Sequence, residues 1–164
     1  MNKFVLVFSL FSMSTLASEQ LNESSVSYGI GAGAPYAGLG GHVAKVSNTD
    51  MKYLAVGCIQ YSTLMGSACG LGAGWMVTDL FGATSNKHGL GIYALQTAGE
   101  ELYFESEGFF AQDKHRTYSA LGLNYTYFSN GINQSGFTFG LSIHATNADY
   151  DEKINGVFQI GYQF

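Results

Sequence analysis

Residues 154–164 read INGVFQIGYQF, and this stretch decides the fold. One set of alternate positions is apolar: Ile154, Phe158, Ile160, Tyr162 and Phe164. The positions between them hold Asn155, Gln159, Gly161 and Gln163. A period of two indicates a β-strand with two different faces. The same period recurs at 137–144 and at 120–127, where the second face again holds Gly, Ser, Thr, Asn, Ala or His.

The second face of these strands carries almost no charge. A water-soluble β-sandwich buries its apolar face and shows a charged one, whereas a barrel in a membrane is apolar outside and polar or small inside. The composition agrees, because 46% of the 164 residues are hydrophobic and only 12% are charged. Disordered chains are rich in charge and poor in aromatics, so disorder is excluded. A net charge of −5 with seven Lys and Arg argues against nucleic-acid binding.

The first seventeen residues have the pattern of a secretory signal peptide. Lys3 is followed by an apolar run at 4–11 and small residues at 12–17, with Thr15 and Ala17 at the positions that a signal peptidase reads. A retained anchor would need about 20 apolar residues, and Glu19 and Glu23 follow too soon. We expect residues 1–17 to be removed and 18–164 to form one domain.

The two cysteines predict the register of a hairpin. If Cys58 lies opposite Cys69, paired residue numbers sum to 127, and one face becomes apolar while the other becomes rich in glycine. In an exported protein such a pair predicts a disulfide bond. The alternative is two unpaired thiols.

Eight strands are expected. Their predicted ranges are 25–46 (one long strand, bent near Pro35), 51–61, 69–80, 88–97, 101–111, 115–128, 137–147 and 153–164. The connections at 47–50, 98–100, 112–114 and 129–131 hold the residue types that turns require. The sequence thus predicts an all-β, antiparallel transmembrane barrel.

The terminal Phe164, preceded at alternate positions by Tyr162, Ile160 and Phe158, resembles the assembly signal of bacterial outer-membrane β-barrel proteins. With the signal peptide, the whole mature chain looks like a small, eight-stranded member of that superfamily. The resemblance implies insertion from the periplasm by the barrel-assembly machinery, a place in the outer membrane, and contact with its lipids and lipopolysaccharide. We expect a monomer. In such barrels the last strand ends in the periplasm, which predicts loops near 47–50, 81–87, 112–115 and 147–152 on the cell surface.

The inward face is where chemistry is expected. Continued alternation turns Glu105, Glu107, Arg116 and His144 inward, and an unpaired buried charge is costly, so these side chains are predicted to form a polar cluster. The alternative to a functional cluster is a polar network that only fills a narrow barrel. The four histidines lie far apart and there is no CxxC, so neither a metal site nor a cofactor is predicted.

The run His144-Ala145-Thr146-Asn147 resembles the His-x-Ser-Asn motif of the lipid A 3-O-deacylases, which are also eight-stranded barrels. The resemblance implies His144 as base and Thr146 as nucleophile. The chain departs from that pattern, because Thr replaces Ser and residues 156–160 hold no Glu. A nucleophilic hydroxyl needs a base that a third group orients, and only the histidine is clearly present.

Three functions remain. The first is a structural or envelope role, or the binding of a small molecule, without a catalytic site. The second is a lipid A-modifying enzyme centred on His144. The third is a narrow conduit for small apolar solutes, since an inner face rich in glycine and alanine leaves more room than one of long side chains.

Overall fold

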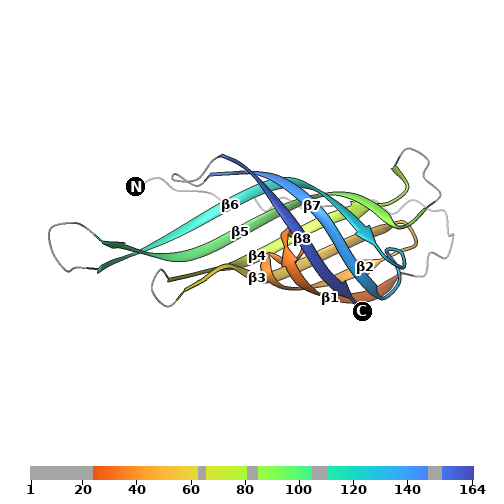
Figure 1. Ribbon diagram of the computed structural model, residues 1–164, viewed down its shortest axis with the longest axis horizontal. Coiled ribbons are helices and arrows are strands. Elements are labelled where there is room, and N and C mark those ends of the chain that lie inside the picture. Colours follow the sequence, from red (N-terminus) through yellow and green to blue (C-terminus); the bar gives the residue numbers. More distant parts are fainter. Residues whose placement is uncertain (1–23, 63–65, 81–84, 105–110, 148–152) are drawn as a thin grey trace, which may run out of the picture.

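The computed structural model describes residues 24–62, 66–80, 85–104, 111–147 and 153–164; at 60–62, 66–67, 98–104 and 111–116 it describes the backbone alone. Eight antiparallel strands close into a barrel in sequence order (Figure 1), which confirms the predicted fold class. The strands are β1 Ser25–Gly33, β2 Gly38–Val46, β3 Asp50–Ser62, β4 Gly66–Val77, β5 His88–Phe104, β6 Ala111–Phe128, β7 Gly136–Thr146 and β8 Ile154–Gln163. Within the described residues, no helix has the length and hydropathy needed to cross a membrane.

The first predicted strand is in fact two. A short 3-10 helix, η1 (Ala34–Tyr36), separates β1 from β2, and the two strands pair antiparallel from Gly33 opposite Gly38 down to the start of β1. The reversal needs a left-handed backbone at Gly33 (φ 112°), Ala37 (φ 55°) and Gly38 (φ 102°), and glycine adopts positive φ at little cost. Pro35 begins the turn, so the predicted bend became a full reversal.

The predicted hairpin at 98–100 does not exist. Strand β5 runs through it, and Gly99 pairs with Arg116 of β6. The predicted turn at 112–114 likewise lies inside β6. Alternation explains the error: Leu90, Ile92, Leu102 and Phe104 share one parity, and the turn-forming residues between them do not interrupt it. Splitting one strand and fusing two others left the predicted total unchanged.

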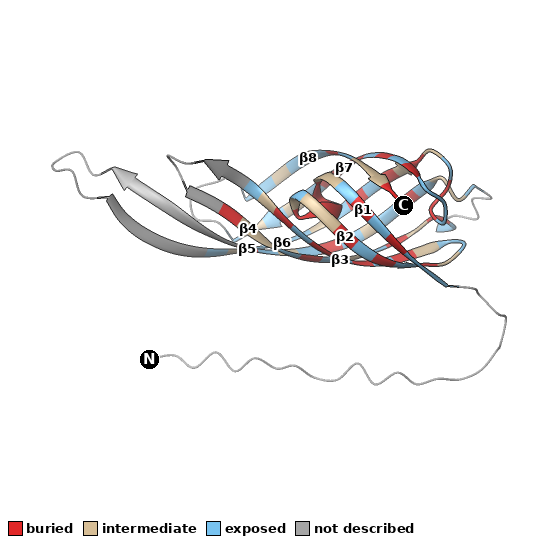
Figure 2. Ribbon diagram, turned by 90° about the horizontal axis from the view of Figure 1, so that it is seen from below, coloured by how far each residue is buried: buried red, intermediate tan, exposed pale blue. Residues whose placement is uncertain are grey.

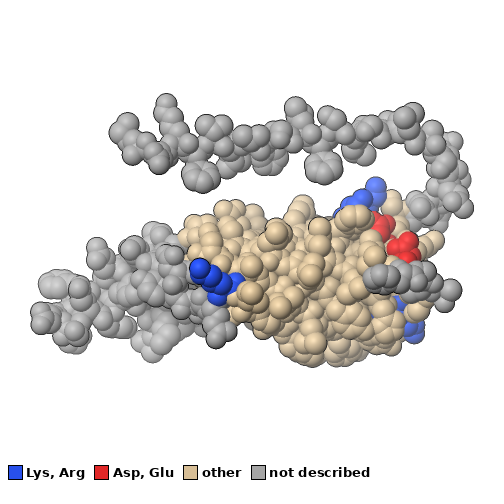
Figure 3. Space-filling view, turned by 90° about the horizontal axis from the view of Figure 1, so that it is seen from above, with Lys and Arg blue, Asp and Glu red and all other residues tan. Residues whose placement is uncertain are grey.

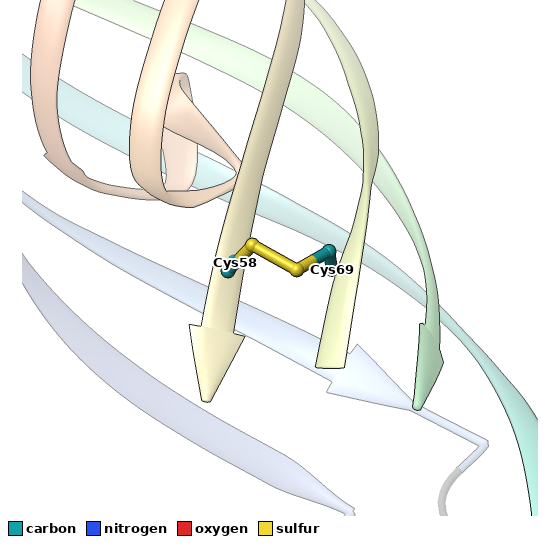
Figure 4. The surroundings of a disulfide bond; sticks show 2 residues. All are labelled: Cys58 and Cys69. Carbon is teal, nitrogen blue, oxygen red and sulfur yellow. A yellow bond between two sulfur atoms is a disulfide. The ribbon is translucent and has the colours of Figure 1, made fainter. Parts of the chain in front are cut away.

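The cysteine hairpin has the predicted register. Cys58 pairs with Cys69, Val56 with Leu71 and Lys52 with Trp75, so every pair from 52 to 58 has numbers that sum to 127. The two cysteines form a disulfide bond on the outward face, joining β3 to β4 (Figure 4). A bulge follows immediately at Ile59, where the register shifts.

The turn at 47–49 and the described residues 78–80 and 85–87 lie at the end of the barrel that carries Phe164, contrary to the predicted loop arrangement. Ser25 pairs with Val46 at this end, where the C terminus also lies, since Phe164 N donates to Tyr28 O. The turn at 129–135 joins them, and we call this the C-terminal end. The opposite, distal end holds the connections between β3 and β4, β5 and β6, and β7 and β8. Of the predicted surface loop at 147–152, residues 148–152 lie outside the described residues.

The polarity of the barrel is inverted relative to a water-soluble protein. Outward-facing positions expose large apolar side chains on every strand. The most exposed on each of the eight are Val26, Leu39, Leu54, Leu71, Ile92, Leu121, Leu141 and Phe158. The charged side chains that the structure describes are Lys45, Asp50, Lys52, Asp79, Lys87 and Lys153. They gather toward the two ends and leave an uncharged belt between (Figure 3).

Candidate functional site

The interior of the barrel is sealed at its C-terminal end by apolar side chains. Ile132, from the turn at 129–135, is fully buried and packs in one cluster with Phe128, Met51, Met76 and Val46. Gln163 Nε2 donates to Ile132 O at 2.7 Å, which holds the turn inside the barrel. A passage through the barrel would require these side chains to move apart.

Side-chain amides link the turns at this end. Asn86 Nδ2 donates to Asn133 Oδ1, and Asn133 Nδ2 donates to Asn48 Oδ1, each at 3.1 Å. Three separate connections are therefore joined across the mouth of the barrel, which supports the seal below them.

Three aromatic rings in contact fill the middle of the barrel. Tyr36, carried inward by η1, stacks on His42, and His42 lies against Tyr53, with ring centroids 5.1 and 5.5 Å apart. Tyr36 Oη and Thr138 Oγ1 are hydrogen-bonded at 2.7 Å, and His42 Nδ1 lies 3.1 Å from Pro35 O. His42 Nε2 and Tyr53 Oη are buried with no hydrogen-bond partner among the described residues.

The abundance of inward glycines led us to expect free space inside the barrel. At Gly161 and Gly74 large side chains occupy that space instead. A Cβ at Gly161 would collide with the Tyr36 ring, and one at Gly74 would collide with the Tyr53 ring. The tyrosine rings lie in the space that a side chain at each of these glycines would need. We call the filled interior from η1 to the C-terminal end the closed half.

The interior beyond η1, toward the distal end, is different, and we call it the open half. Most of its described inward-facing side chains are partly exposed, namely Leu95, Tyr118, Ala120, His144, Thr146, Asn155 and Val157. Thr97, which pairs with Tyr118, and Ala68 are buried. Figure 2 shows buried residues concentrated from the η1 turn toward the C terminus. Water therefore reaches the inner face of the open half.

His144 lies in the open half, on the inward face of β7, as predicted. Its Nδ1 lies 2.9 Å from Tyr93 Oη, and the two rings meet edge to face. Gly122, between them on β6, is required, since a Cβ there would lie 2.7 Å from both Tyr93 Cζ and His144 Cβ. In a catalytic triad a carboxylate is hydrogen-bonded to the second ring nitrogen of the histidine. Here the Tyr93 hydroxyl is hydrogen-bonded to one of the His144 ring nitrogens.

Thr146 lies two residues further along the same face of β7. It pairs with Ala120, and its backbone N–H donates to Lys153 O at 3.0 Å. The acidic residues that follow it, Asp149, Asp151 and Glu152, lie outside the described residues. The structure therefore places the predicted base and nucleophile on one face and gives the base a phenol as its partner.

Arg116 is the only other predicted member of the polar cluster that the described backbone includes, and it lies far from His144. Glu105 and Glu107 lie outside the described residues, and for Arg116 only the backbone is described. His144 pairs with Gly122 on β6, six positions from Arg116 (122 − 116 = 6). At 3.3–3.4 Å per residue this separates the two backbones by about 20 Å. Sequence reasoning instead missed Tyr93, Tyr36 and Tyr53, although two of these aromatics stand on a face otherwise made of small residues.

Chemically, the described interior is a set of neutral hydrogen-bonding groups. No described charged side chain is buried, and no three His, Cys, Asp or Glu among the described residues are grouped so as to hold a metal ion. Phenol, imidazole and amide groups can orient a neutral or amphipathic ligand.

The fold and this interior define a closed eight-stranded antiparallel barrel with an apolar exterior and one sealed end. Comparisons with models of protein families, with curated proteins and with solved structures gave no match.

Proposed function

We propose that the protein is a small outer-membrane β-barrel protein that binds a small molecule in its open half. The observation that carries the membrane assignment is the inverted polarity, with large apolar side chains exposed around the barrel and Gln159, Asn124 and Thr126 buried inside. Water-soluble monomers rarely expose an apolar surface of this extent. In hydrocarbon, backbone groups must be paired internally, and the closed order of eight antiparallel strands pairs most of them.

The sealed end supports binding over conduction. Side chains that are 0–2% exposed fill the barrel at Ile132, Val46 and Met51, whereas the distal half leaves inward-facing groups accessible. A ligand that enters from the distal end meets a floor made by η1 and the Tyr93–His144 pair. A purely structural role uses the same scaffold without a ligand.

A lysine scan of the outward face of β6 tests the membrane assignment. Leu123 is 60% exposed near the middle of the apolar belt, and Leu123→Lys should destabilise the barrel folded in lipid bilayers by about 2–4 kcal/mol, since that is the cost of a cation at the bilayer midplane. Thr117→Lys, on the same face but toward the distal end, is the matched control and should cost about 0–1 kcal/mol.

Unfolding by urea in phosphatidylcholine vesicles, followed by the loss of the faster gel migration of unheated protein, measures both variants. Equal costs at Leu123 and Thr117 would contradict a membrane-spanning barrel. Fractionation of expressing cells, with the protein in the outer-membrane fraction, is the companion result that we expect.

A further inference from the structure

The wall of the barrel is incomplete on one side. Strand β8 pairs with β7 along its whole length, from Ile154 to Gln163, but on its other edge only Ile160–Gln163 pair with β1. On the far side of the same hairpin, the β2–β3 ladder ends at Leu39 opposite Cys58, although β3 continues to Ser62. Gly33, the last residue of β1, still lies against Gln159 and Phe158, and no described strand pairs with this edge of β8 from Ile154 to Val157. Figure 1 shows the short orange hairpin ending where the long β5 and β6 continue.

This gap falls within the apolar belt of the proposed membrane protein, so the inference rests on the proposed function. Along β8 the outward apolar positions run from Phe164 to Ile154, ten residues (164 − 154 = 10), with Lys153 just beyond. Strands tilted by about 45° rise about 2.3 Å per residue along the membrane normal, so this run covers about 23 Å. That matches an apolar band about 25 Å tall. Strand β1 ends at Gly33, only five residues (33 − 28 = 5) past Tyr28, which adjoins Phe164, and therefore covers about half of the band.

The open edge carries backbone groups that have no partner strand among the described residues. In an antiparallel strand alternate residues direct both N–H and C=O to the same side. Phe164 N donates toward β1, so the same side receives the backbone groups of Ile154 and Gly156. Such groups cost several kcal/mol each if they face hydrocarbon without a partner. An occupant of the gap must therefore accept or donate hydrogen bonds as well as tolerate lipid.

Behind the gap lies the open half of the interior. The buried turn Ala34–Ala37 borders the gap on the side of the C-terminal end. Asn155 and Val157 face inward beside it, and Leu95 lies across the barrel on β5, which is opposite β1 in the closed order of eight strands. Outside, Ile154 and Phe158 are 62% and 63% exposed, and Leu39 is 73% exposed. The side chains outside the gap, and Val157 and Leu95 inside it, are therefore apolar, whereas Asn155 and the backbone edge of β8 are polar. His144 and Tyr93 lie further inside.

We infer that this gap is a lateral entrance through which an acyl chain of a surrounding membrane lipid enters the open half. The acyl chain covers Val157 and Leu95, and the polar linkage of the lipid forms hydrogen bonds with the backbone edge of β8. A strand of a second copy paired along the outside of β8 would satisfy the edge but would leave the inner face behind it uncovered. A lipid covers both, which favours it as the occupant.

Fluorescence quenching by brominated lipid tests the entrance. In a Trp75→Phe background the chain has no other tryptophan, so single indoles can be introduced at three positions. Val157→Trp places one inside, at the gap. Phe158→Trp places one outside, on the same strand. Tyr53→Trp exchanges one buried aromatic for another inside the barrel, behind the continuous β2–β3–β4 ladder. Each variant is folded into phosphatidylcholine vesicles with and without bromine on the acyl chains.

We expect Val157→Trp to lose fluorescence to the same extent as Phe158→Trp, while Tyr53→Trp loses little. Quenching of Val157→Trp no greater than that of Tyr53→Trp overturns the entrance and leaves the membrane assignment intact, provided that Phe158→Trp is quenched. Absence of quenching at Phe158→Trp overturns the proposed function itself. If Val157→Trp does not fold, as judged by heat-dependent gel migration, Leu95→Trp reports on the same space with the same two readings.

Discussion

The closed and open halves of the barrel are built from the same eight strands, yet side chains fill the closed half, whereas the open half has partly exposed inner side chains. In the closed half several inward glycines face a large side chain from a neighbouring element, as Gly161 faces Tyr36 and Gly74 faces Tyr53. In the open half the wall is incomplete, because the β1–β2 hairpin ends early and its tip folds inward. One short hairpin therefore both fills one half and exposes the other. The packing that stabilises the barrel lies in the closed half, and the inner face that a ligand could reach lies in the open half.

The largest effect expected from breaking this contrast comes from the disulfide. Cys58 and Cys69 are 11 residues apart, and they join β3 to β4 where the β2–β3 ladder stops. Closing a loop of this length contributes about 3 kcal/mol by chain entropy. We expect the Cys58→Ser, Cys69→Ser double variant to lose about 2–3 kcal/mol of unfolding free energy.

Hydrogen exchange locates that loss. Amides of β3 and β4 beyond the cysteines should exchange faster, while those near Met51 and Met76 should keep their protection, because the closed half is held by packing. Uniformly faster exchange would show that the two halves unfold as one unit.

A pair of glycine substitutions on β8 gives the next largest effect. A Cβ at Gly161 would collide with the Tyr36 ring, whereas one at Gly156 meets nothing nearer than Ser142 O at 3.9 Å. Gly161→Ala should therefore cost about 2 kcal/mol by overpacking, and Gly156→Ala should stabilise by about 0.5 kcal/mol. Urea unfolding in bilayers compares them, and similar values for both would contradict the filled interior of the closed half.

A smaller effect is expected from removing single hydroxyls. Tyr36→Phe deletes a buried hydrogen bond to Thr138, and its loss should cost about 1 kcal/mol. Tyr93→Phe deletes the bond to His144, which is partly exposed, so water can replace the lost partner and the cost should be near the lower limit of about 0.5 kcal/mol. The same unfolding experiment measures both, and a larger cost at Tyr93 would place His144 in a drier setting than its exposure indicates.

Much of this architecture follows from alternation in the sequence. The faces of the strand segments at 120–127, 137–144 and 154–164 were assigned correctly, because a period of two does not depend on where strands end. One assumed cysteine contact gave the β3–β4 register. Strand ends were less predictable, since the residues at 98–100 suit a turn as well as a strand and only the pairing of Gly99 decides. The contact between Tyr36 and Gly161 could not be foreseen, because the two residues are remote in the chain. The contact between Tyr53 and Gly74 follows from the predicted cysteine register, which pairs them. The gap has the same origin: it depends on how far one strand extends relative to its neighbours.

The smallest expected effect concerns the open half as an enzyme. Lipid A from cells that express the protein, its His144→Ala variant or an empty vector should give the same mass spectrum, because the His144 Nδ1 is held by the Tyr93 hydroxyl and a phenol does not orient and stabilise an imidazolium as a carboxylate does. Gel migration of the unheated variant confirms that it is folded. Loss of an acyl chain with the parent protein, but not with His144→Ala, would turn the open half into an active site. The lateral entrance would then be the route by which its substrate arrives, so this measurement separates a site that holds a lipid from one that cuts it.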